Sequence, residues 1–456
     1  MSVDIIIERL KDKNILLLGF GKEGRSSYAF IRKYFPNIFL TIADKNTENI
    51  CPVLEHDSNL QLISGECYLD VINDYDVVLK SPGISLKGIS LLDKSKISSQ
   101  TDLFLLAFAS QCIGVTGTKG KSTTTSLLYH ILQSIGDDVL IAGNIGVPFF
   151  DIIERINLST KIMVELSSHQ LEFISKAPHI SILLNLYEEH LDHYRNFMDY
   201  QQAKFNIASC QSENDYFIYN TTDELILNLL ESNKVKSKCL GFSFTKNNKS
   251  VSYVRNSYFC FLKDNNEEKI TEINESFPLK GEHNLLNVTA VVAALQCMDS
   301  IDNLQIEKAL YTFKGLEHRL ERIGEFDGII FYNDSISTIP QATIAAINAL
   351  KDVNTLILGG FDRGVDYHQF IDFLEKSDVH NFIFTGDAGK RMMKLFNNQE
   401  NKNLYFIETY FEIVELAKKC TQKGKICLLS PAAASYDQFK NFEHRGNMFK
   451  QLIIKK

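Results

Sequence analysis

The sequence predicts an α/β protein built from three domains, and three observations support this fold class. Its 456 residues leave room for three domains of about 150 residues each. Apolar runs of strand length alternate with stretches of helical periodicity along most of the chain. Glycine-rich turns near residues 19 and 117 each connect a strand to the following helix. This alternation is typical of parallel, doubly wound sheets.

The first segment, residues 1–100, contains three predicted strands: NILLLGF (14–20), FLTIAD (39–44) and DVVLKSPG (76–83). The first strand runs into GFGKEG, in which Gly19, Gly21 and Gly24 match the GxGxxG pattern of dinucleotide-binding turns. Asp44 ends the next strand. This pattern fits a nicotinamide dinucleotide, another nucleotide with a diphosphate, or only close packing of a helix on the sheet, and the residues alone leave these alternatives open.

The second segment, residues 101–315, contains the predicted strands CIGVT, VLIAG, KIMVEL and ISILLNL. Short β-rich runs between residues 216 and 280 predict a small antiparallel excursion, and a helix is expected over residues 283–296. The strongest motif of the whole chain lies here, in CIGVTGTKGKSTTT (112–125). Its glycines allow the backbone to wrap around a phosphate, and the N-terminus of the following helix offers unpaired N–H groups.

Within this loop, Lys121 is placed to reach terminal phosphates and the Ser122 hydroxyl to bind Mg²⁺. The loop is a GTxGK[ST] variant, because Val115 stands where the common phosphate loop has its first glycine. Glu165 ends the strand KIMVEL and His190 follows the strand ISILLNL, so both are expected to be ligands of Mg²⁺ or Mn²⁺ near ATP. Lys204, in DYQQAKFNIA, is by its spacing alone a solvent-exposed lysine.

The third segment, residues 316–456, contains the predicted strands GIIFYND, NTLILGG, NFIFTGD and KICLLSP. Ligands of open α/β sheets bind at the carboxyl ends of strands, where Asp334, Arg363 and the serine-rich turn 430–435 stand. The Arg363 guanidinium is suited to bind a carboxylate with two hydrogen bonds.

Composition narrows the class of partners. The chain has 48 Lys and Arg against 56 Asp and Glu, a net charge of −8, which argues against a general binder of nucleic acids or membrane surfaces. Its 9 cysteines are scattered without a CxxC pair, as in proteins of a reducing cytosol. Charges interrupt the first apolar stretch, so no signal peptide is predicted, and no apolar run is long enough to cross a membrane. We expect a cytoplasmic protein and a monomer.

Taken together, the motifs resemble the Mur ligase family, which builds the peptidoglycan stem peptide by ATP-dependent amide formation. The resemblance covers essentially the whole chain and rests on GTKGKS, ELSSHQL, EEHLDHY, GEHNLLN, EHR and NDSISTIP. The stretches GFGKEGRS, SPGI and SPAAASYDQFKNFEHRG resemble the members that add D-glutamate. The resemblance implies a Rossmann-like domain for UDP (1–100), a central P-loop ATPase-type domain (101–315) and a Rossmann-like domain for the amino acid (316–456).

By position, the resemblance also implies four groups of site residues. The UDP substrate would contact Gly19, Gly21, Gly24, Asp44, Ser81, Pro82, Gly83, Asn144 and Gln170. ATP would contact Gly117, Thr118, Lys119, Gly120, Lys121, Ser122, Thr123, Asn284, Asn287, Arg319 and Asp334. D-glutamate would contact Arg363, Ser435, Tyr436 and Phe442. The metal would lie near Ser122, Glu165, His190 and Lys204, and the catalytic residues would be Lys121, His190 and Lys204.

The implied substrates are ATP, D-glutamate and UDP-N-acetylmuramoyl-L-alanine, joined through an acyl phosphate in the synthesis of a cell-wall precursor. Lys204 matches a family lysine that CO₂ converts to a carbamate, and this replaces the interpretation from spacing. The chain departs from the family pattern at three positions. Lys119 stands where many members have Asn, Ile336 stands where the motif DSKAT has its lysine, and Arg363 stands where some members have lysine.

Three alternatives remain open at this point. Another member of the same family would differ in the amino acid that it adds. A dinucleotide-dependent oxidoreductase would use GFGKEG, but it would leave GTKGKS unexplained. A regulatory or binding protein with a phosphate loop would form no amide product.

Overall fold

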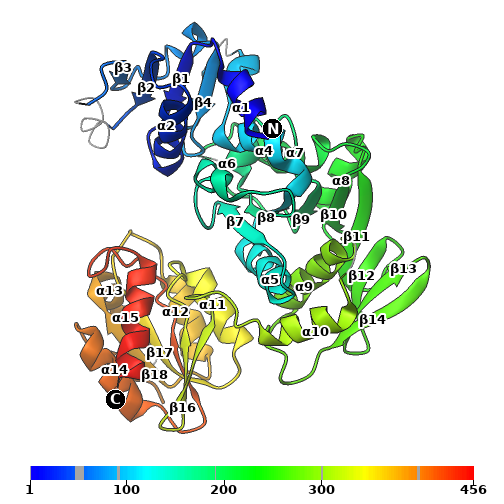
Figure 1. Ribbon diagram of the computed structural model, residues 1–456. Helices are drawn as coiled ribbons and strands as arrows, with labels where there is room; N and C mark the ends of the chain where they lie inside the picture. The colour runs from blue at the N-terminus through cyan, green and yellow to red at the C-terminus, as the bar shows by residue number, and fades with distance from the viewer. Residues whose placement is uncertain are drawn as a thin grey trace. The chain divides into compact units, whose positions relative to one another are not determined.

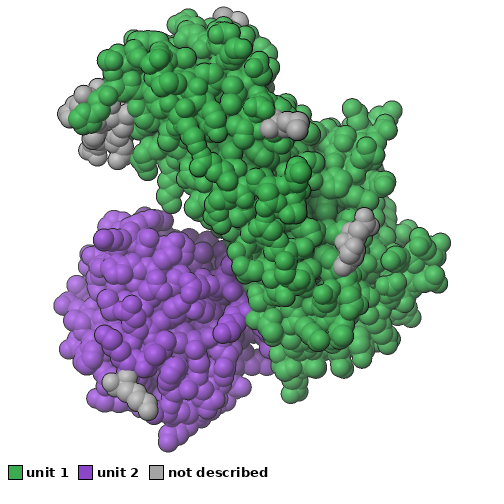
Figure 2. Space-filling view, viewed as in Figure 1, with its two compact units in different colours: residues 1–277, 282–313 green, residues 278–281, 314–456 purple. Residues whose placement is uncertain are grey.

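The computed structural model describes residues 2–46, 56–89, 93–190, 192–298, 301–397 and 401–455. The chain forms two compact units, one of residues 1–277 and 282–313 (unit 1) and one of residues 278–281 and 314–456 (unit 2), as Figure 2 shows. Unit 1 contains two β-sheets and unit 2 contains one (Figure 1). The predicted α/β fold class is confirmed, whereas the boundary near residue 100 stays a prediction.

The first sheet of unit 1 has five parallel strands in the order β3-β2-β1-β4-β5. Its strands are β1 (Ile15–Leu18), β2 (Leu40–Asp44), β3 (Leu60–Ser64), β4 (Val77–Lys80) and β5 (Ile97–Ser98). The helices of this part are α1 (Ser2–Leu10), α2 (Lys22–Tyr34) and α4 (Gln100–Phe108). Strands β1, β2 and β4 confirm the three predicted strands. The sequence analysis missed β3, in which only Leu60 is buried, and β5, which has two residues.

Strand β1 illustrates why these runs form strands. All four of its residues are buried. Ile15 and Leu17 pack into one hydrophobic cluster while Leu16 and Leu18 pack into another, because successive side chains of a strand point to opposite faces. Burial on both faces requires a continuous apolar run, and parallel sheets covered by helices have this pattern. The larger cluster continues without a break into the second sheet, where it includes Ile162 and Val164.

The second sheet of unit 1 has nine strands in the order β14-β13-β12-β11-β10-β9-β6-β8-β7. They are β6 (Cys112–Thr116), β7 (Val139–Gly143), β8 (Lys161–Glu165), β9 (Ile180–Leu183), β10 (Tyr216–Asn220), β11 (Lys238–Thr245), β12 (Ser250–Arg255), β13 (Tyr258–Lys263) and β14 (Asn266–Glu272). The helices are α5 (Lys121–Ser134), α6 (Ser168–Leu171), α7 (Phe197–Ser209), α8 (Glu224–Ser232), α9 (Glu282–Leu295) and α10 (Asn303–Thr312). The expected antiparallel part is confined to β12–β14, since β10 and β11 continue the parallel sheet.

Unit 2 contains a six-stranded sheet in the order β15-β16-β20-β17-β18-β19, parallel except for the edge strand β15. Its strands are β15 (Glu321–Phe326), β16 (Ile329–Asn333), β17 (Val353–Gly359), β18 (Asn381–Thr385), β19 (Asn403–Phe406) and β20 (Ile426–Leu429). Its helices are α11 (Pro340–Ala349), α12 (His368–Lys376), α13 (Gly386–Lys394), α14 (Tyr410–Cys420) and α15 (Phe442–Ile454). The four predicted strands are β16, β17, β18 and β20.

Two further expectations concern membranes and thiols. Of the helices in the described ranges, none combines the length and the apolar composition needed to cross a bilayer. Eight cysteines lie in the described residues and all eight are free thiols. The ninth, Cys51, lies outside them.

Candidate active site

The phosphate loop connects β6 to α5, and two of its glycines are required by geometry. Gly117 and Gly120 have φ angles of 151° and 88°, which L side chains rarely adopt. A Cβ atom on Gly120 would lie 2.6 Å from Oδ1 of Asn287, which belongs to α9. Gly120 is also the N-cap of α5, and no side chain caps this end of the helix. The loop therefore presents an uncapped helix N-terminus, the geometry that binds anions.

The loop is held in place by the segment that follows β9. The backbone N–H of Thr118 donates to the carbonyl oxygen of Asn185 at 3.0 Å, and the N–H of Lys119 donates to Oδ1 of the same residue at 2.8 Å. The Lys119 ammonium forms an ion pair of 2.5 Å with Glu189. Lys119 thus binds the loop that carries His190, a role that a neutral asparagine could not fill in the same way.

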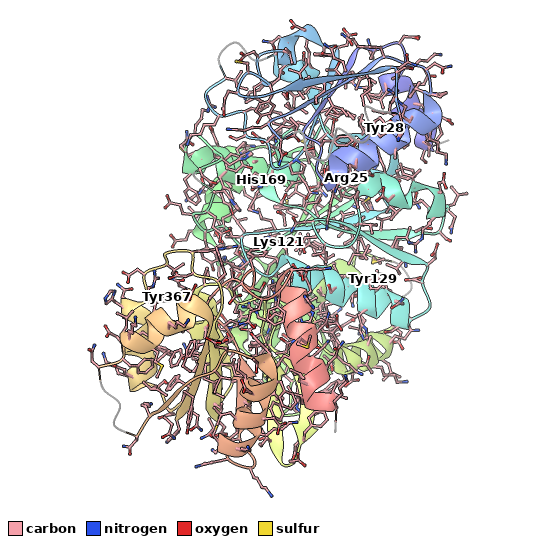
Figure 3. All side chains as sticks on the ribbon, turned by 90° about the vertical axis from the view of Figure 1, so that its left-hand side faces the viewer. Arg25, Tyr28, Lys121, Tyr129, His169 and Tyr367 are labelled. Atoms are coloured by element: carbon pink, nitrogen blue, oxygen red, sulfur yellow. The ribbon has the colours of Figure 1, made fainter. Side chains whose placement is uncertain are left out.

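Two lysines converge on the carbonyl oxygen of Gly117. Nζ of Lys121 lies 2.9 Å from this oxygen and 3.0 Å from that of Thr118 (Figure 3 labels Lys121). Nζ of Lys204 donates to the same Gly117 oxygen at 2.9 Å. The Lys204 side chain is buried, and burial together with the positive charge of Lys121 lowers the pKa of its amine well below the usual value.

The interpretation of Lys204 from spacing alone was wrong. Helix α7 is buried on most of its surface, since Tyr200, Phe205 and Ile207 are buried along with Lys204. Nζ of Lys204 also lies 5.2 Å from the centre of the Tyr200 ring, one helical turn earlier. A helix covered on several sides gives no amphipathic pattern from which an inward lysine could be recognised.

Glu165 lies at the carboxyl end of β8, beside the phosphate loop strand β6. Its Oε1 accepts a hydrogen bond of 2.6 Å from Nδ2 of Asn144, a residue that is predicted to contact the UDP substrate. Its Oε2 is buried and has no hydrogen-bond partner among the described residues. A buried carboxylate oxygen without a donor is costly to desolvate, and a hard divalent cation would satisfy it.

His190 follows β9 and has a left-handed backbone, with a φ of 60°. Its ring centre lies 4.8 Å from that of His169, whose ring in turn lies 4.1 Å from that of His193 (Figure 3 labels His169). Burial and the neighbouring histidines lower the pKa of His169 to about 3, so this ring is neutral at physiological pH. In the described part of the chain, no group of three or more His, Cys, Asp or Glu side chains is arranged to hold a metal ion.

The predicted UDP residues of the first segment meet at the carboxyl edge of the first sheet. Oγ of Ser81 donates to the carbonyl oxygen of Gly19 at 3.0 Å, and a Cβ on Gly24 would lie 2.2 Å from that same oxygen. Oδ2 of Asp44 accepts a hydrogen bond of 2.6 Å from the N–H of Phe20. The Asp44 carboxylate therefore fastens the glycine-rich turn.

Three other predicted substrate residues border or join this edge. A Cβ on Gly21 or Gly83 would meet no atom within 4 Å, so both glycines adjoin open space. Pro82 lies between Ser81 and Gly83. Gln170, by contrast, is buried, and its amide is bound to Ser167 on one side and to Glu23 on the other.

The residues predicted for ATP are divided between the two units. Asn284 and Asn287 lie on α9 of unit 1, whereas Arg319 and Asp334 belong to unit 2. Oδ1 of Asp334 accepts from the N–H of Leu320 at 3.1 Å, and burial raises the pKa of the Asp334 carboxyl to about 6. Nε of Arg319 is buried without a hydrogen-bond partner among the described residues.

In unit 2 the predicted D-glutamate residues form two groups. The Arg363 guanidinium lies 5.4 Å from the centre of the exposed Tyr436 ring, next to the buried Ser435. Phe442 begins α15, and its carbonyl oxygen accepts a hydrogen bond of 2.8 Å from Oγ of Ser335. Phe442 is therefore tied to the loop that carries Asp334.

Arg445 was missed by the sequence analysis, although it lies in the stretch SPAAASYDQFKNFEHRG. It is buried and donates to the carbonyl oxygens of Ser335, Ala433 and Ala434, with distances of 2.8–3.2 Å. No carboxylate accepts from it among the contacts of the described residues. The guanidinium therefore holds the serine-rich turn against the Asp334 loop, and a long-range role of this kind has no local signal.

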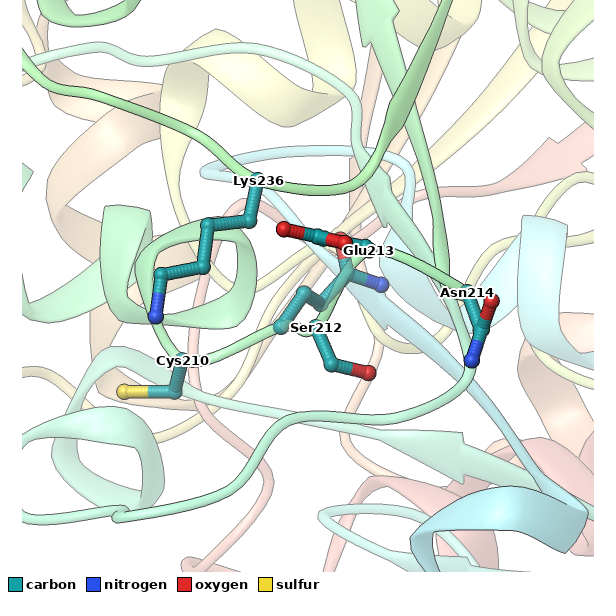
Figure 4. Close-up of a pocket in the computed structure, with 6 residues that line it drawn as sticks. Cys210, Ser212, Glu213, Asn214 and Lys236 are labelled. Carbon is teal, nitrogen blue, oxygen red and sulfur yellow. The ribbon is translucent and has the colours of Figure 1, made fainter.

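A shallow pocket on unit 1 does not belong to this site. It is lined by residues of the connection from α7 to β10 and by Lys236, before β11 (Figure 4). Its lining residues are Cys210, Gln211, Ser212, Glu213, Asn214 and Lys236. No predicted site residue is among them.

Comparison with known proteins identifies the class. Residues 115–295 match the Mur ligase middle domain, and residues 318–433 match the Mur ligase, glutamate ligase domain. The chain belongs to the Mur ligase family.

Two relatives that match over nearly the full length carry the same name. The UDP-N-acetylmuramoylalanine–D-glutamate ligase of Caldicellulosiruptor bescii is 32% identical, with 97% of this chain and 98% of the relative covered. The enzyme of that name from Caldanaerobacter subterraneus subsp. tengcongensis is 33% identical, with 98% and 99% covered. The solved structure of UDP-N-acetylmuramate–alanine ligase MurC from Thermotoga maritima has a TM-score of 0.56 at 19% identity, with 96% and 98% covered. This likeness shows the shared fold.

Proposed function

We propose that this chain joins D-glutamate to UDP-N-acetylmuramoyl-L-alanine and converts ATP to ADP and phosphate to drive formation of the amide bond. The observation that carries the proposal is one cluster at the carboxyl edge of the second sheet. There the phosphate loop, the buried Lys204 and Oε2 of Glu165, which has no hydrogen-bond partner in the described part of the chain, lie together. The names of the full-length relatives support the choice of substrates.

The chemistry follows from the poor reactivity of a carboxylate. Transfer of the γ-phosphoryl group of ATP to the alanine carboxylate gives an acyl phosphate with a good leaving group. The amine of D-glutamate attacks its carbonyl carbon, and phosphate leaves from the tetrahedral intermediate. Lys121 and the uncapped N-terminus of α5 would bind the phosphate oxygens, and catalysis would consist mainly of positioning and charge neutralisation.

The residues fit a divalent cation, Mg²⁺ or Mn²⁺, because Glu165 offers a buried oxygen to which no described residue donates a hydrogen bond. Ser122, Glu165 and His190 would hold it, with phosphate oxygens completing its ligands. When bound, the cation neutralises charge on the phosphates during transfer. Asn144 would keep the Glu165 carboxylate in one orientation through its 2.6 Å hydrogen bond.

We extend the proposal to a carbamate on Lys204. Carbamylation requires an uncharged amine, whose nitrogen attacks CO₂ while a proton leaves. Burial favours the uncharged amine of Lys204, which supports this step. The product is an anion with two oxygens, the kind of ligand that hard cations prefer.

Unit 2 would supply the amino-acid site. The exposed Arg363 would bind a carboxylate of D-glutamate, and Ser435, Tyr436 and Phe442 would enclose the rest of it. The reaction belongs in the cytoplasm, where the cell makes its wall precursors, and we propose that the chain acts as a monomer. The chemistry as a whole would serve peptidoglycan synthesis and thereby cell shape and division.

The test is ADP release by the purified chain with a panel of amino acids and UDP-muramoyl acceptors. The proposal requires release that depends on both D-glutamate and UDP-N-acetylmuramoyl-L-alanine. Release with another amino acid instead would identify a different member of the family. No amide product with any acceptor would point to a binding protein.

A further inference from the structure

A buried lysine at the end of β4 has no role in the proposed reaction. Lys80 is 3% exposed, and its Nζ lies 3.4 Å from Oε2 of Glu172 in unit 1. The same Glu172 oxygen lies 3.3 Å from Nε2 of His193. We call Lys80, Glu172 and His193 the Lys80 triad. Its members come from three segments of the chain, β4, the end of α6 and the loop after β9.

The triad joins two parts of the proposed substrate site. Lys80 directly precedes the turn Ser81-Pro82-Gly83, which is predicted to hold UDP. His193 lies three residues after His190. We call the segment after β9 that carries His190 and His193 the metal-side loop. The contacts from Lys80 through Glu172 to His193 therefore connect the Ser81-Pro82-Gly83 turn of the first sheet to the metal-side loop of the second sheet.

A second contact repeats this connection on the other side of the turn. Oγ of Ser85 donates to the carbonyl oxygen of His193 at 2.8 Å. Inside the loop, the N–H groups of His193 and Tyr194 donate to the carbonyl oxygen of His190 at 3.0 and 3.1 Å. Displacement of His193 would therefore also displace His190.

Other charged and titratable groups surround the triad. Glu23, on α2, lies near Lys80 and accepts a hydrogen bond of 2.8 Å from Gln170. His169 packs its ring against that of His193. A buried charge is unfavourable without partners, and apolar replacement of a whole buried ion pair is often neutral or stabilising. Stability alone therefore does not explain why ionic groups lie between the two sheets. A need to hold these segments in a fixed geometry would explain it.

We propose that the Lys80 triad is a positioning device that transmits the position of the Ser81-Pro82-Gly83 turn to His190, so that binding of the UDP substrate orders the metal-side loop. The inference rests on the proposed function for the identity of the substrate. It assigns to Lys80, Glu172 and His193 a role in alignment without contact to the reacting atoms.

The test compares Lys80→Met, Glu172→Gln and the double variant. Each single change leaves a charge without its partner, buried on Lys80 or half-buried on Glu172, so each should lower the melting temperature. The double variant removes both charges and should regain most of that loss. If the triad positions the loop, the double variant has a wild-type KM for ATP, a KM for UDP-N-acetylmuramoyl-L-alanine raised at least about 10-fold and a lower kcat. If the triad has only a structural role, the double variant should instead regain the wild-type kcat and both KM values together with the melting temperature.

Hydrogen exchange gives a readout that does not depend on turnover. Adding UDP-N-acetylmuramoyl-L-alanine to the wild type should protect the amides of both the glycine-rich turn 19–24 and the loop at His193 and Tyr194. The double variant should keep protection of the turn and lose that of the loop. The proposal is overturned if the ligand protects the loop equally in both proteins. It is also overturned if the ligand protects only the turn in the wild type.

A matched control removes an ion pair elsewhere in unit 1. Lys161 and Asp137 form a pair of 2.6 Å at the start of β8, the strand end opposite Glu165. The double variant Lys161→Met/Asp137→Asn should keep the wild-type kinetics and protection. If the wild type neither binds this UDP substrate nor releases ADP with it, the proposed function fails, and that result differs from loss of loop coupling alone.

Discussion

Asn144 donates a hydrogen bond of 2.6 Å to Oε1 of Glu165, while Oε2 of the same carboxylate is buried and unpartnered among the described residues. The amide thus holds one oxygen and leaves the other for a cation. This pairing connects a predicted substrate residue to a predicted metal ligand on the next strand.

Replacing Asn144 by Ala should therefore weaken metal binding. A hydrogen bond to a charged group contributes about 1.5–3 kcal/mol, so we expect kcat/KM to fall about 10- to 100-fold and the Mg²⁺ concentration for half-maximal activity to rise. Titration of activity with Mg²⁺ measures both. Asn157→Ala is the control, since it removes an equivalent bond to Asp138 away from the site. An unchanged Mg²⁺ requirement in the Asn144 variant would contradict the role.

Lys204→Ala should be nearly inactive and still folded, as judged by circular dichroism and the melting temperature. If the missing group is an anionic carbamate, acetate or formate should partly restore turnover. Lys204→Arg should remain inactive when acetate or formate is added, because arginine keeps its positive charge and cannot be carbamylated in the same way. Lys236→Ala, at an exposed lysine, serves as the control. Substantial activity of either Lys204 variant in CO₂-depleted buffer would contradict a catalytic role for the carbamate on Lys204.

Arg363→Ala should raise the KM for D-glutamate far more than the KM for ATP. An arginine–carboxylate pair that loses water on binding contributes ~2–4 kcal/mol, which corresponds to roughly 30- to 1,000-fold in affinity. Steady-state kinetics with each substrate varied in turn would measure the two constants. Arg195→Ala, at an exposed arginine paired with Asp199, should change neither. A rise in the KM for ATP alone would assign Arg363 to the nucleotide.

Glu23→Gln should change how stability depends on pH. Burial raises the pKa of the Glu23 carboxyl from 4.5 to about 7, so the folded chain binds this proton more tightly than the unfolded chain. The stability contributed by the group is present below pH 4.5 and is lost as pH rises toward about 7. The glutamine cannot ionise and avoids this loss. Relative to wild type, the free energy of unfolding of the variant should therefore rise by about 3 kcal/mol across this range.

Urea unfolding at a series of pH values would measure this difference. Glu66→Gln provides a surface control in the same segment, because Glu66 is exposed and pairs with Lys45. Parallel stability curves for wild type and Glu23→Gln would show that Glu23 has an ordinary pKa in the folded chain.

Local patterns predicted much of the fold. Runs such as NILLLGF were recognisable because a strand buried on both faces must be apolar throughout. Strand β3 escaped because most of its residues are only partly buried, so LQLIS has no such run. Helix α9 was predicted to within one residue at each end, since Leu286, Ala290, Ala293 and Ala294 recur at helical spacing in the sequence.

Local sequence patterns predicted less of the candidate active site than of the fold. The two phosphate-loop glycines could be recognised from the sequence because left-handed backbone favours glycine. The burial of Lys204 depends on elements that pack around α7 on several sides, and spacing carries no trace of them. Gln170 and Glu23 are 147 residues apart, and their hydrogen bond exists only after two sheets have come together. Contacts of this range depend on tertiary structure, for which a single sequence has no pattern.

The hydrophobic cluster common to both sheets of unit 1 also has a thermodynamic consequence. Because Ile15 and Val164 belong to the same core, the glycine-rich turn and the phosphate loop should melt in one cooperative transition. A ligand that binds only the folded form of either element stabilises the whole cooperative unit by mass action. Occupancy of the first sheet would thus raise the temperature at which both sheets unfold together, whereas exchange of phosphate-loop amides by local opening would not respond to it.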